Sequence, residues 1–268
     1  MINNIQSFFR QLRFNWHWSI AKNLSHEKME KISSLISPQE TNFELVRIGG
    51  ENDGGYLLPN DFSNLSACYS PGVGDSAEFE LNMAQKGIKC FLADASVNKS
   101  PIDDKNIHFD KMFLGTKTKD NKITLCDWID KYSQNNDDLI LQMDIEGDEY
   151  QVLEKTPIET LSRFRIMIIE FHRTHLILTK SGYGKMVKAL EKIHQNFIPV
   201  HLHNNNARPF ITFNDYKIPR VFELTFLRRD RVQNFKPVKF LPHQLDKQNI
   251  AGLENPKVPD WMYGKQIK

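Results

Sequence analysis

The chain has 268 residues, 40% of them hydrophobic and 25% charged, which is enough to bury the core of one large α/β domain or two small ones. The net charge of +2 is small and the basic residues are scattered, which argues against a nucleic-acid-binding protein. No apolar run approaches the roughly 20 residues of a membrane-spanning helix. Cys68, Cys90 and Cys126 have neither the number nor the spacing of a disulfide framework or a cysteine zinc site. We therefore expect a cytoplasmic protein in a reducing compartment.

Residues 1–37 have a largely helical pattern that ends at the Ser37-Pro38 step, because a residue before proline is displaced from the helical region. Apolar residues would lie along one side of this segment, namely Phe8, Phe9, Leu12 and Trp16. Packing or dimerisation is the better interpretation of that side, and attachment to a membrane surface is the weaker one. We assign residues 1–40 to an N-terminal helical extension that could support a homodimer.

From about Phe43, short apolar runs alternate with helical stretches, which predicts a parallel sheet with crossover helices. The predicted strands are residues 67–70, 88–93, 111–114, 139–143, 165–171, 197–202 and 221–226. The predicted helices are residues 76–85, 124–132, 148–155 and 184–194. The last two strands should form an antiparallel hairpin at one edge. The expected fold is α/β, with a Rossmann-like, doubly wound, seven-stranded sheet in residues 41–240 and an irregular tail in residues 241–268.

The most informative segment is residues 69–79, where an apolar run is followed by two glycines and then by a helical pattern. Gly72 and Gly74 allow the backbone to turn sharply and to approach a ligand with no Cβ in the way. Asp75 or Ser76 could cap the helix that follows. This combination of strand, glycine loop and helix predicts a site for a nucleoside cofactor.

An acid at the end of the next predicted strand supports that prediction. Asp94 stands twenty residues after Gly74 and is followed by Ala95, and an acid there can accept hydrogen bonds from both ribose hydroxyls. The same glycine spacing also satisfies the dinucleotide fingerprint, so NAD stays open as an alternative. No tyrosine of the chain has a lysine four positions later, however, and Glu78 would repel a pyrophosphate. A positively charged sulfonium tolerates that acid better, which favours S-adenosylmethionine.

The segment from Asp144 to Leu153 begins Asp-Ile-Glu-Gly-Asp-Glu and resembles the FkbM family of methyltransferases, in which an apolar strand ends in Asp-x-Glu-Gly-x-Glu before a helix. Other matching stretches follow in family order at residues 53–56, 169–172, 201–205 and 222–226. The resemblance runs from roughly Leu45 to Arg229. The cofactor loop departs from the family's commoner Asp-x-Gly-Ala form, since no acid precedes its first glycine.

The resemblance implies a class I methyltransferase sheet that binds S-adenosylmethionine. It implies O-methyl transfer, often onto sugars of bacterial glycans or onto natural products. It also places Tyr56, in the glycine-tyrosine turn, at the edge of the cofactor site. Without the resemblance, Asp53 and Tyr56 would only flank a type II turn at Gly54-Gly55.

Polar side chains end three predicted strands, at the edge where open α/β sheets bind ligands: Asp144 with Glu146, Glu170 with His172, and His201 with His203. Because side chains alternate along a strand, Glu170 and His172 share a face, as do His201 and His203. This mixture of imidazoles and carboxylates suits Fe²⁺, Mn²⁺ or Zn²⁺ better than Mg²⁺. We therefore predict a divalent metal site formed by Asp144, Glu170, His172, His201 and His203.

Asp144 and His172 are also the candidate catalytic residues. A metal chelated by neighbouring acceptor hydroxyls would lower the pKa of one of them and fix its orientation. Alternatively, His172 or Asp144 takes the proton directly as a general base. The plainer structural interpretations are that Asp144 bonds only the backbone of its own turn and that His201 and His203 belong to a solvated edge strand.

The sequence thus predicts an S-adenosylmethionine-dependent O-methyltransferase that acts on a sugar or nucleotide-sugar in bacterial capsule or surface-glycan biosynthesis, assisted by a divalent metal. The alternatives, in order, are a metal-independent O-methyltransferase, an NAD-dependent oxidoreductase and a non-catalytic binding module. No nucleic-acid partner is expected. Three arginines could hold an anionic part of the acceptor, such as a diphosphate, or could simply be solvated: Arg173, Arg208 and Arg220.

Overall fold

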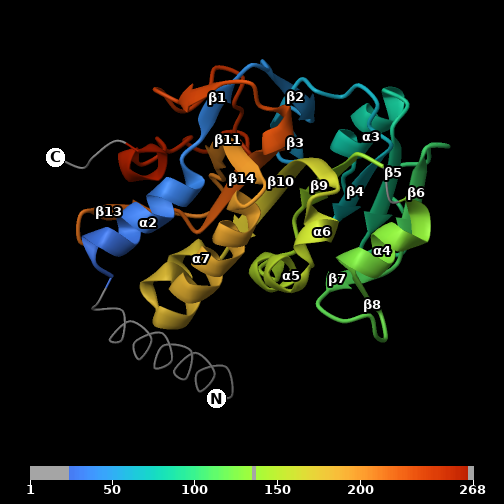
Figure 1. The fold of residues 1–268 in the computed structure, drawn as a ribbon, viewed down its shortest axis with the longest axis horizontal. Coiled ribbons are helices and arrows are strands. Elements are labelled where there is room, and N and C mark those ends of the chain that lie inside the picture. The colour runs from blue at the N-terminus through green and yellow to red at the C-terminus, as the bar shows by residue number, and fades with distance from the viewer. Residues whose placement is uncertain (1–23, 135–136, 265–268) are drawn as a thin grey trace.

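The computed structural model describes residues 24–134 and 137–264, and a seven-stranded sheet with the order β11-β14-β10-β9-β4-β5-β6 forms its centre (Figure 1). Its strands are β4 (Ala67–Pro71), β5 (Lys89–Ala93), β6 (Ile107–Asp110), β9 (Leu139–Met143), β10 (Phe164–His172), β11 (Phe197–Asn204) and β14 (Val221–Arg228). Neighbouring strands pair in parallel except β14, which is antiparallel to both β10 and β11. The predicted doubly wound sheet, with an antiparallel pair at one edge, is therefore confirmed.

The third strand of the sheet lies earlier in the chain than predicted, because β6 begins at Ile107 and the chain leaves the sheet after Asp110. Residues 111–114 were expected there, but β7 (Phe113–Gly115) pairs instead with β8 (Lys122–Thr124) in a separate small sheet. The physical reason is that β6 is an edge strand, in which the polar His108 and Asp110 alternate with half-buried apolar residues. The continuous apolar run after it resembled a buried strand more closely.

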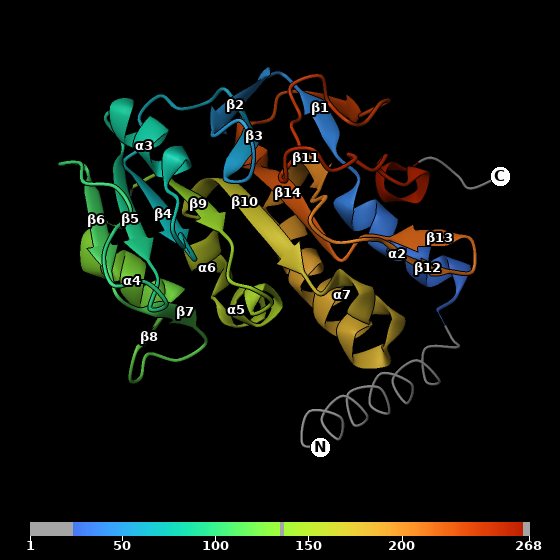
Figure 2. The same ribbon diagram turned by 180° about the vertical axis from the view of Figure 1, so that it is seen from behind.

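Helices cover one face of the sheet, and a helix with a β-hairpin covers the other (Figures 1 and 2). The first face buries side chains of α2 (His26–Ile36), α4 (Leu125–Tyr132), α5 (Glu149–Lys155), α6 (Ile158–Leu161) and α7 (Lys180–His194). The second face packs against α3 (Glu78–Gln85) and the hairpin of β2 (Leu45–Gly49) and β3 (Gly55–Pro59). Threonine side chains cap two of the helices, Thr124 at α4 and Thr179 at α7.

Shorter elements complete the described fold: β1 (Gln39–Thr41) with β15 (Phe235–Pro237), the hairpin of β12 (Ile211–Phe213) and β13 (Tyr216–Ile218), and the 3-10 turns η2 (Thr174–Leu178), η3 (Arg229–Arg231) and η4 (Asp260–Tyr263). The N-terminal helix α2 is present, whereas Phe8, Phe9, Leu12 and Trp16 fall outside the described residues. The C-terminal segment is irregular but packed, since Trp261, Met262 and Tyr263 are buried.

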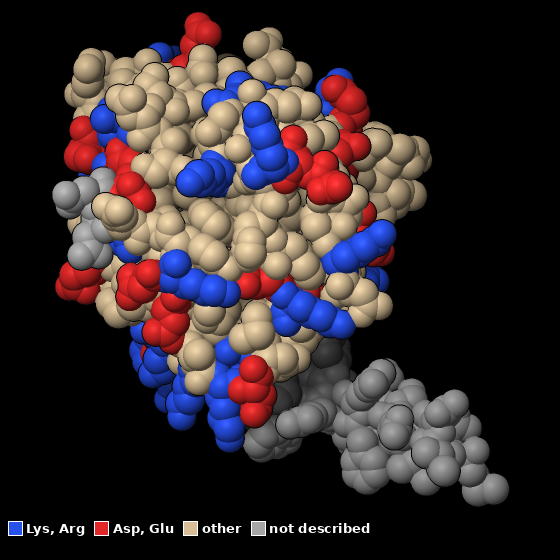
Figure 3. All heavy atoms as spheres, turned by 90° about the vertical axis from the view of Figure 1, so that its right-hand side faces the viewer, with Lys and Arg blue, Asp and Glu red and all other residues tan. Residues whose placement is uncertain are grey.

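Two surface properties bear on the expected partners. No helix in the described ranges is both long enough and apolar enough to cross a membrane. On the face shown in Figure 3, basic and acidic side chains are intermingled rather than gathered into a field of one sign.

Candidate active site

The predicted glycine loop leaves the carboxyl end of β4, where the strand order of the sheet reverses between β4 and β9. Gly72 has φ +88°, and a Cβ added to it would lie 1.5 Å from the Asp144 carbonyl oxygen. Glycine is therefore required there by both its conformation and the close approach of the β9 turn. Gly74 has φ +55° with nothing within 4 Å of an added Cβ, so its backbone borders open space.

Asp94 fixes the glycine loop in place from the end of β5. Its Oδ2 accepts a hydrogen bond from the Gly74 backbone N–H at 2.9 Å, and its Oδ1 accepts from the Ser96 N–H at 2.7 Å and hydroxyl at 2.6 Å. A carboxylate offers about four lone-pair positions, so these contacts leave Asp94 capacity for a further donor. The sequence predicted an acid at this place, and the structure adds that it also orders the loop.

A cleft of about 710 Å³ opens beside this loop, within the range of sites that enclose small ligands. Its lining includes predicted cofactor residues Gly72, Gly74, Asp75 and Asp94, and Ala95 lies between two lining residues. Phe113 and Leu114 of β7 supply an apolar wall. A smaller hollow of about 110 Å³ adjoins the cleft and is lined by Tyr56, Glu78 and Glu80, among others.

A buried polar chain lies beneath the smaller hollow. The Gln142 amide donates to the Tyr56 hydroxyl at 3.0 Å, while the Ser70 hydroxyl lies 2.6 Å from Gln142 Oε1 and also contacts Glu80. Burial raises the pKa of Glu80 to about 7, although the Ser70 hydroxyl opposes the shift. Ser70 has one hydrogen to share between two acceptors, so the chain is fully satisfied when Glu80 is protonated and donates to Ser70.

His172 ends β10 next to Arg173, which lines the cleft, and one side of its ring contacts a buried carboxylate. Its Nδ1 lies 2.9 Å from Glu149 Oε1, and that oxygen also accepts the Gly147 N–H at 2.9 Å. The Glu149 side chain is completely buried. Because Glu149 occupies Nδ1, the opposite nitrogen, Nε2, is directed toward the Asp144 turn.

Three carboxylates surround that nitrogen without hydrogen-bonding to it. His172 Nε2 lies 3.7 Å from Asp144 Oδ1, 3.6 Å from Glu146 Oε2 and 3.7 Å from Glu170 Oε1. Asp144 and Glu146 line the cleft, so the group opens onto it. The structure thus brings together Asp144, Glu170 and His172 of the predicted set, and adds Glu146.

Crowding of these acids shifts their pKa values. Burial raises the pKa of Asp144 to about 7, with nearby carboxylates adding to the shift and His172 opposing it. Burial, followed by the charges of Asp144 and Glu223, raises the pKa of Glu170 well above its usual range. Burial alone would lower the pKa of His172, but the Glu149 hydrogen bond and the surrounding carboxylates raise it overall. The same crowding thus raises the pKa of all three groups above the value each would have alone in water.

Comparison with known proteins agrees with this geometry. The family model described as a methyltransferase FkbM domain matches residues 31–198, which is more than half of the chain. The chain belongs to the FkbM methyltransferase family. No curated protein matches it at a significant level. Membership makes the chain a methyltransferase, implies S-adenosylmethionine as the methyl donor and removes the ground for the NAD-dependent oxidoreductase.

In this FkbM methyltransferase, the two other predicted metal ligands contact the C-terminal segment. His201 Nε2 and His203 Nδ1 lie 3.0 and 3.5 Å from Asp246 Oδ1, and all three side chains are buried. Burial alone would lower the pKa of His203, but Asp246 and the Glu223 charge raise it to about 9. His203 Nε2 lies 3.1 Å from Asn249 Oδ1. Because both imidazoles are buried against Asp246, His201 and His203 do not belong to a solvated edge strand. Neither imidazole is within ion-pair distance of Asp144 in the described structure.

Asp53 and Glu223 extend the acidic group of the methyltransferase toward this C-terminal segment. Carboxylate oxygens of Asp53, Glu170 and Glu223 lie within 4.8 Å of one another, and Glu170 and Glu223 are register partners on β10 and β14. The Asn249 amide donates to Glu223 at 2.8 Å, and the same nitrogen lies 3.0 Å from Asp53 Oδ1. Sequence reasoning missed these contacts because nothing local connects Asn249 with Asp53.

Proposed function

We propose that this methyltransferase transfers a methyl group to a hydroxyl oxygen of a sugar or nucleotide-sugar, as bacterial capsule or surface-glycan biosynthesis requires. The observation that carries the proposal is the His172–Glu149 pair. Glu149 contacts Nδ1 of the imidazole, and the other nitrogen, Nε2, faces Asp144, which lines the cleft. A hydroxyl is a poor nucleophile while protonated, so transfer to oxygen needs a group that accepts the hydroxyl proton. Transfer to a more nucleophilic atom would not require this arrangement.

The residues present fit the methyl donor that the family implies. The main chain at Gly72 and Gly74 would lie against S-adenosylmethionine. The Asp94 carboxylate would accept hydrogen bonds from its ribose hydroxyls. The acids Asp53 and Glu78, which line the smaller hollow, complement a cationic ligand. Bound S-adenosylmethionine supplies an electrophilic methyl group on a sulfonium.

His172 then removes the proton from the acceptor. Its Nε2 would accept the hydroxyl proton while the acceptor oxygen gains the methyl group and the sulfur–methyl bond of the donor breaks, leaving a neutral thioether. Glu149 would stabilise the resulting imidazolium through Nδ1. Asp144 lies 3.7 Å from the same nitrogen and can accept the proton next, since its pKa is raised to about 7. The acids around His172 therefore favour the charged imidazolium that the reaction produces.

The same donors fit a divalent metal, as the sequence suggested. Asp144 Oδ1 is buried without a hydrogen-bond partner, and the separations of 3.6 to 3.7 Å around Nε2 are those of ligands facing a shared space. Ligand atoms of Asp144, Glu149 and His172 lie within 4.8 Å of one another, so these three would hold Fe²⁺, Mn²⁺ or Zn²⁺, whereas Glu170 groups with Asp53 and Glu223. Such an ion would lower the pKa of a chelated acceptor hydroxyl and fix its orientation.

The test is to purify the protein without chelator, measure bound metals by elemental analysis and titrate S-adenosylmethionine by calorimetry with and without EDTA. Transfer of labelled methyl to a panel of sugars and nucleotide-sugars is then measured for the wild type and for His172→Gln, with His108→Gln on the exposed edge strand as control. We expect cofactor binding in all three proteins and transfer in all but His172→Gln.

Stoichiometric metal together with EDTA-sensitive transfer would support the metal-assisted form. Transfer that is insensitive to EDTA in a metal-free protein would leave His172 and Asp144 as the proton acceptors. Full transfer by His172→Gln would overturn the proposal. A protein that binds the cofactor but methylates no hydroxyl compound would be a binding module or an enzyme with a different acceptor atom.

A further inference from the structure

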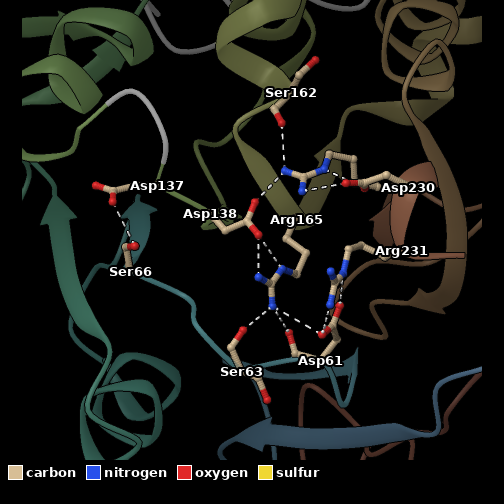
Figure 4. A network of polar contacts seen from close by, with 10 residues as sticks. Asp61, Ser63, Ser66, Asp137, Asp138, Ser162, Arg165, Asp230 and Arg231 are labelled. Carbon is tan, nitrogen blue, oxygen red and sulfur yellow. Dashed lines mark hydrogen bonds and ion pairs between the residues drawn. The ribbon is translucent and has the colours of Figure 1, made fainter.

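Arginines near the start of strand β10 and arginines beyond its carboxyl end differ in whether they form ion pairs with acidic side chains. At the edge where β10 begins, Arg165 and Arg231 bind Asp61 and Asp138, as Figure 4 shows. At the opposite edge, Arg173, Arg208 and Arg220 make no ion pair or side-chain hydrogen bond with any described residue. Arg173 and Arg220, which flank the paired ends of β10 and β14 beside the candidate active site, thus differ from Arg165 and Arg231 in having no acidic partner among the described residues.

Two of these arginines are fixed next to each other and beside His172. Arg173 directly follows β10 and Arg220 directly precedes β14, where His172 and Val221 are register partners. The Thr174 N–H donates to the Arg220 carbonyl at 3.1 Å, which joins the two segments. These backbone contacts place the main chain of both arginines at the end of the strand that supplies His172, and both side chains lie near enough to His175 for their charges to act on it.

The side chain of Arg173 lies across the turn that carries Asp144 and Glu146. A Cβ added to Gly147 would lie 2.9 Å from Arg173 Nε, and Gly147 itself has φ +112°. Arg173 is one of the residues that line the cleft. Glu146 and Asp148 line the cleft too, but neither comes within ion-pair distance of Arg173 in the described structure.

Two buried polar atoms near Arg173 are unsatisfied within the described part of the chain. Arg220 Nε and His175 Nδ1 have no hydrogen-bond partner among the described residues. Burial, and then the charges of Arg220 and Arg173, lower the pKa of His175. Two like charges beside unpaired polar atoms form an unfavourable arrangement that a bound oxyanion would relieve by accepting charge-assisted hydrogen bonds.

We propose that Arg173, Arg220 and His175 form an oxyanion subsite for the acceptor, so that the preferred acceptor carries a phosphate, diphosphate or carboxylate group. The inference rests on the proposed transfer to a sugar hydroxyl. Because Arg173 directly follows His172, an anion held there would bring a nearby hydroxyl of the same acceptor to His172 Nε2. The subsite thereby determines acceptor specificity rather than the chemistry of transfer.

The experiment titrates inorganic pyrophosphate, inorganic phosphate and glucuronate into the full-length protein by calorimetry, with and without saturating S-adenosylmethionine. The variants are Arg220→Gln, Arg220→Lys and Arg173→Gln. The matched control is Arg229→Gln. Among the described residues, the guanidinium of this exposed arginine donates only to the His194 carbonyl, at 3.1 and 3.2 Å. Thermal unfolding and cofactor affinity of each variant show whether it remains folded.

We expect wild type and Arg229→Gln to bind at least one anion equally, and Arg220→Gln and Arg173→Gln to lose about tenfold to a hundredfold in affinity. Arg220→Lys should be intermediate, since a lysine keeps the charge without the planar fork. Tighter binding of pyrophosphate would identify a nucleotide-sugar acceptor, and tighter binding of glucuronate an acidic sugar.

Three results would overturn the subsite: no anion binding by the wild type, equal losses in Arg220→Gln and Arg229→Gln, or anion binding that S-adenosylmethionine abolishes. The last result would assign these arginines to the carboxylate of the cofactor. Anion binding is measured without turnover. A protein that binds anions as expected but methylates no sugar would therefore contradict the proposed function and leave the subsite standing.

Discussion

Replacing Glu149 with glutamine tests whether the buried carboxylate behind His172 positions the proton acceptor. The change keeps the side-chain shape but removes the charge that Nδ1 contacts at 2.9 Å. A hydrogen bond to a charged group contributes about 1.5–3 kcal/mol. Each change of about 1.36 kcal/mol in the barrier alters the rate tenfold, so we expect kcat/KM to fall roughly tenfold to 150-fold.

The pH profile provides a readout that loss of packing would not move. Glu149 raises the pKa of His172, and activity requires the neutral imidazole, so wild-type kcat/KM should fall as pH decreases through the neutral range. In Glu149→Gln that acid limb should shift to lower pH, because the imidazolium loses its partner.

The assay is methyl transfer at saturating cofactor, with Glu154→Gln as control, since this residue lies on the same helix and pairs only distantly with Lys188 at 3.9 Å. A Glu149→Gln enzyme with the wild-type rate and the wild-type pH profile would refute the assigned role. Equal losses in both variants would indicate damage to α5 rather than to the His172 pair.

Two further substitutions test the cofactor loop and the C-terminal segment. Gly72→Ala should destabilise the fold and abolish cofactor binding, because the added Cβ would overlap the Asp144 carbonyl. The Cβ of Gly74→Ala meets no atom. Equal melting temperatures of these two variants would contradict this account. Asp246→Asn should cost about 3–5 kcal/mol by leaving buried imidazolium unpaired, a fall in Tm of roughly 6–20 °C. The pKa of His203 is raised from 6.5 to about 9, so its contribution is full below pH 6.5 and is lost as pH rises through 9. Across that pH range, the melting temperature of Asp246→Asn should therefore depend less on pH than that of the wild type. The same pH dependence in both proteins would count against the pairing.

Much of the fold could be read from local patterns. The alternation of apolar runs with helical stretches predicted the seven-stranded sheet, whereas the strand order, with its reversal between β4 and β9, is given by the structure. The glycine loop was evident because Gly72 and Gly74 stand directly between a strand and a helix. The edge strand was misplaced, since exposure on one side makes an edge strand such as β6 resemble a loop in sequence.

The site depended more on contacts between distant residues. Placing Asp144, Glu170 and His172 together required only the rule that parallel strands end at the same edge of a sheet. The burial of Glu149 against His172 could not be read in the same way, because helix-terminal acids usually face solvent.

The sequence by itself determined that this chain is a methyltransferase of the FkbM family with a glycine loop after the first strand of the central sheet, because short-range spacing encodes both features. Only the tertiary structure decided which partner each buried polar group has. Asp246 lies against His201 and His203 from an irregular segment that carries no periodic pattern. Burial fixes such pairings, since a charge removed from water must find its partner wherever the fold places one.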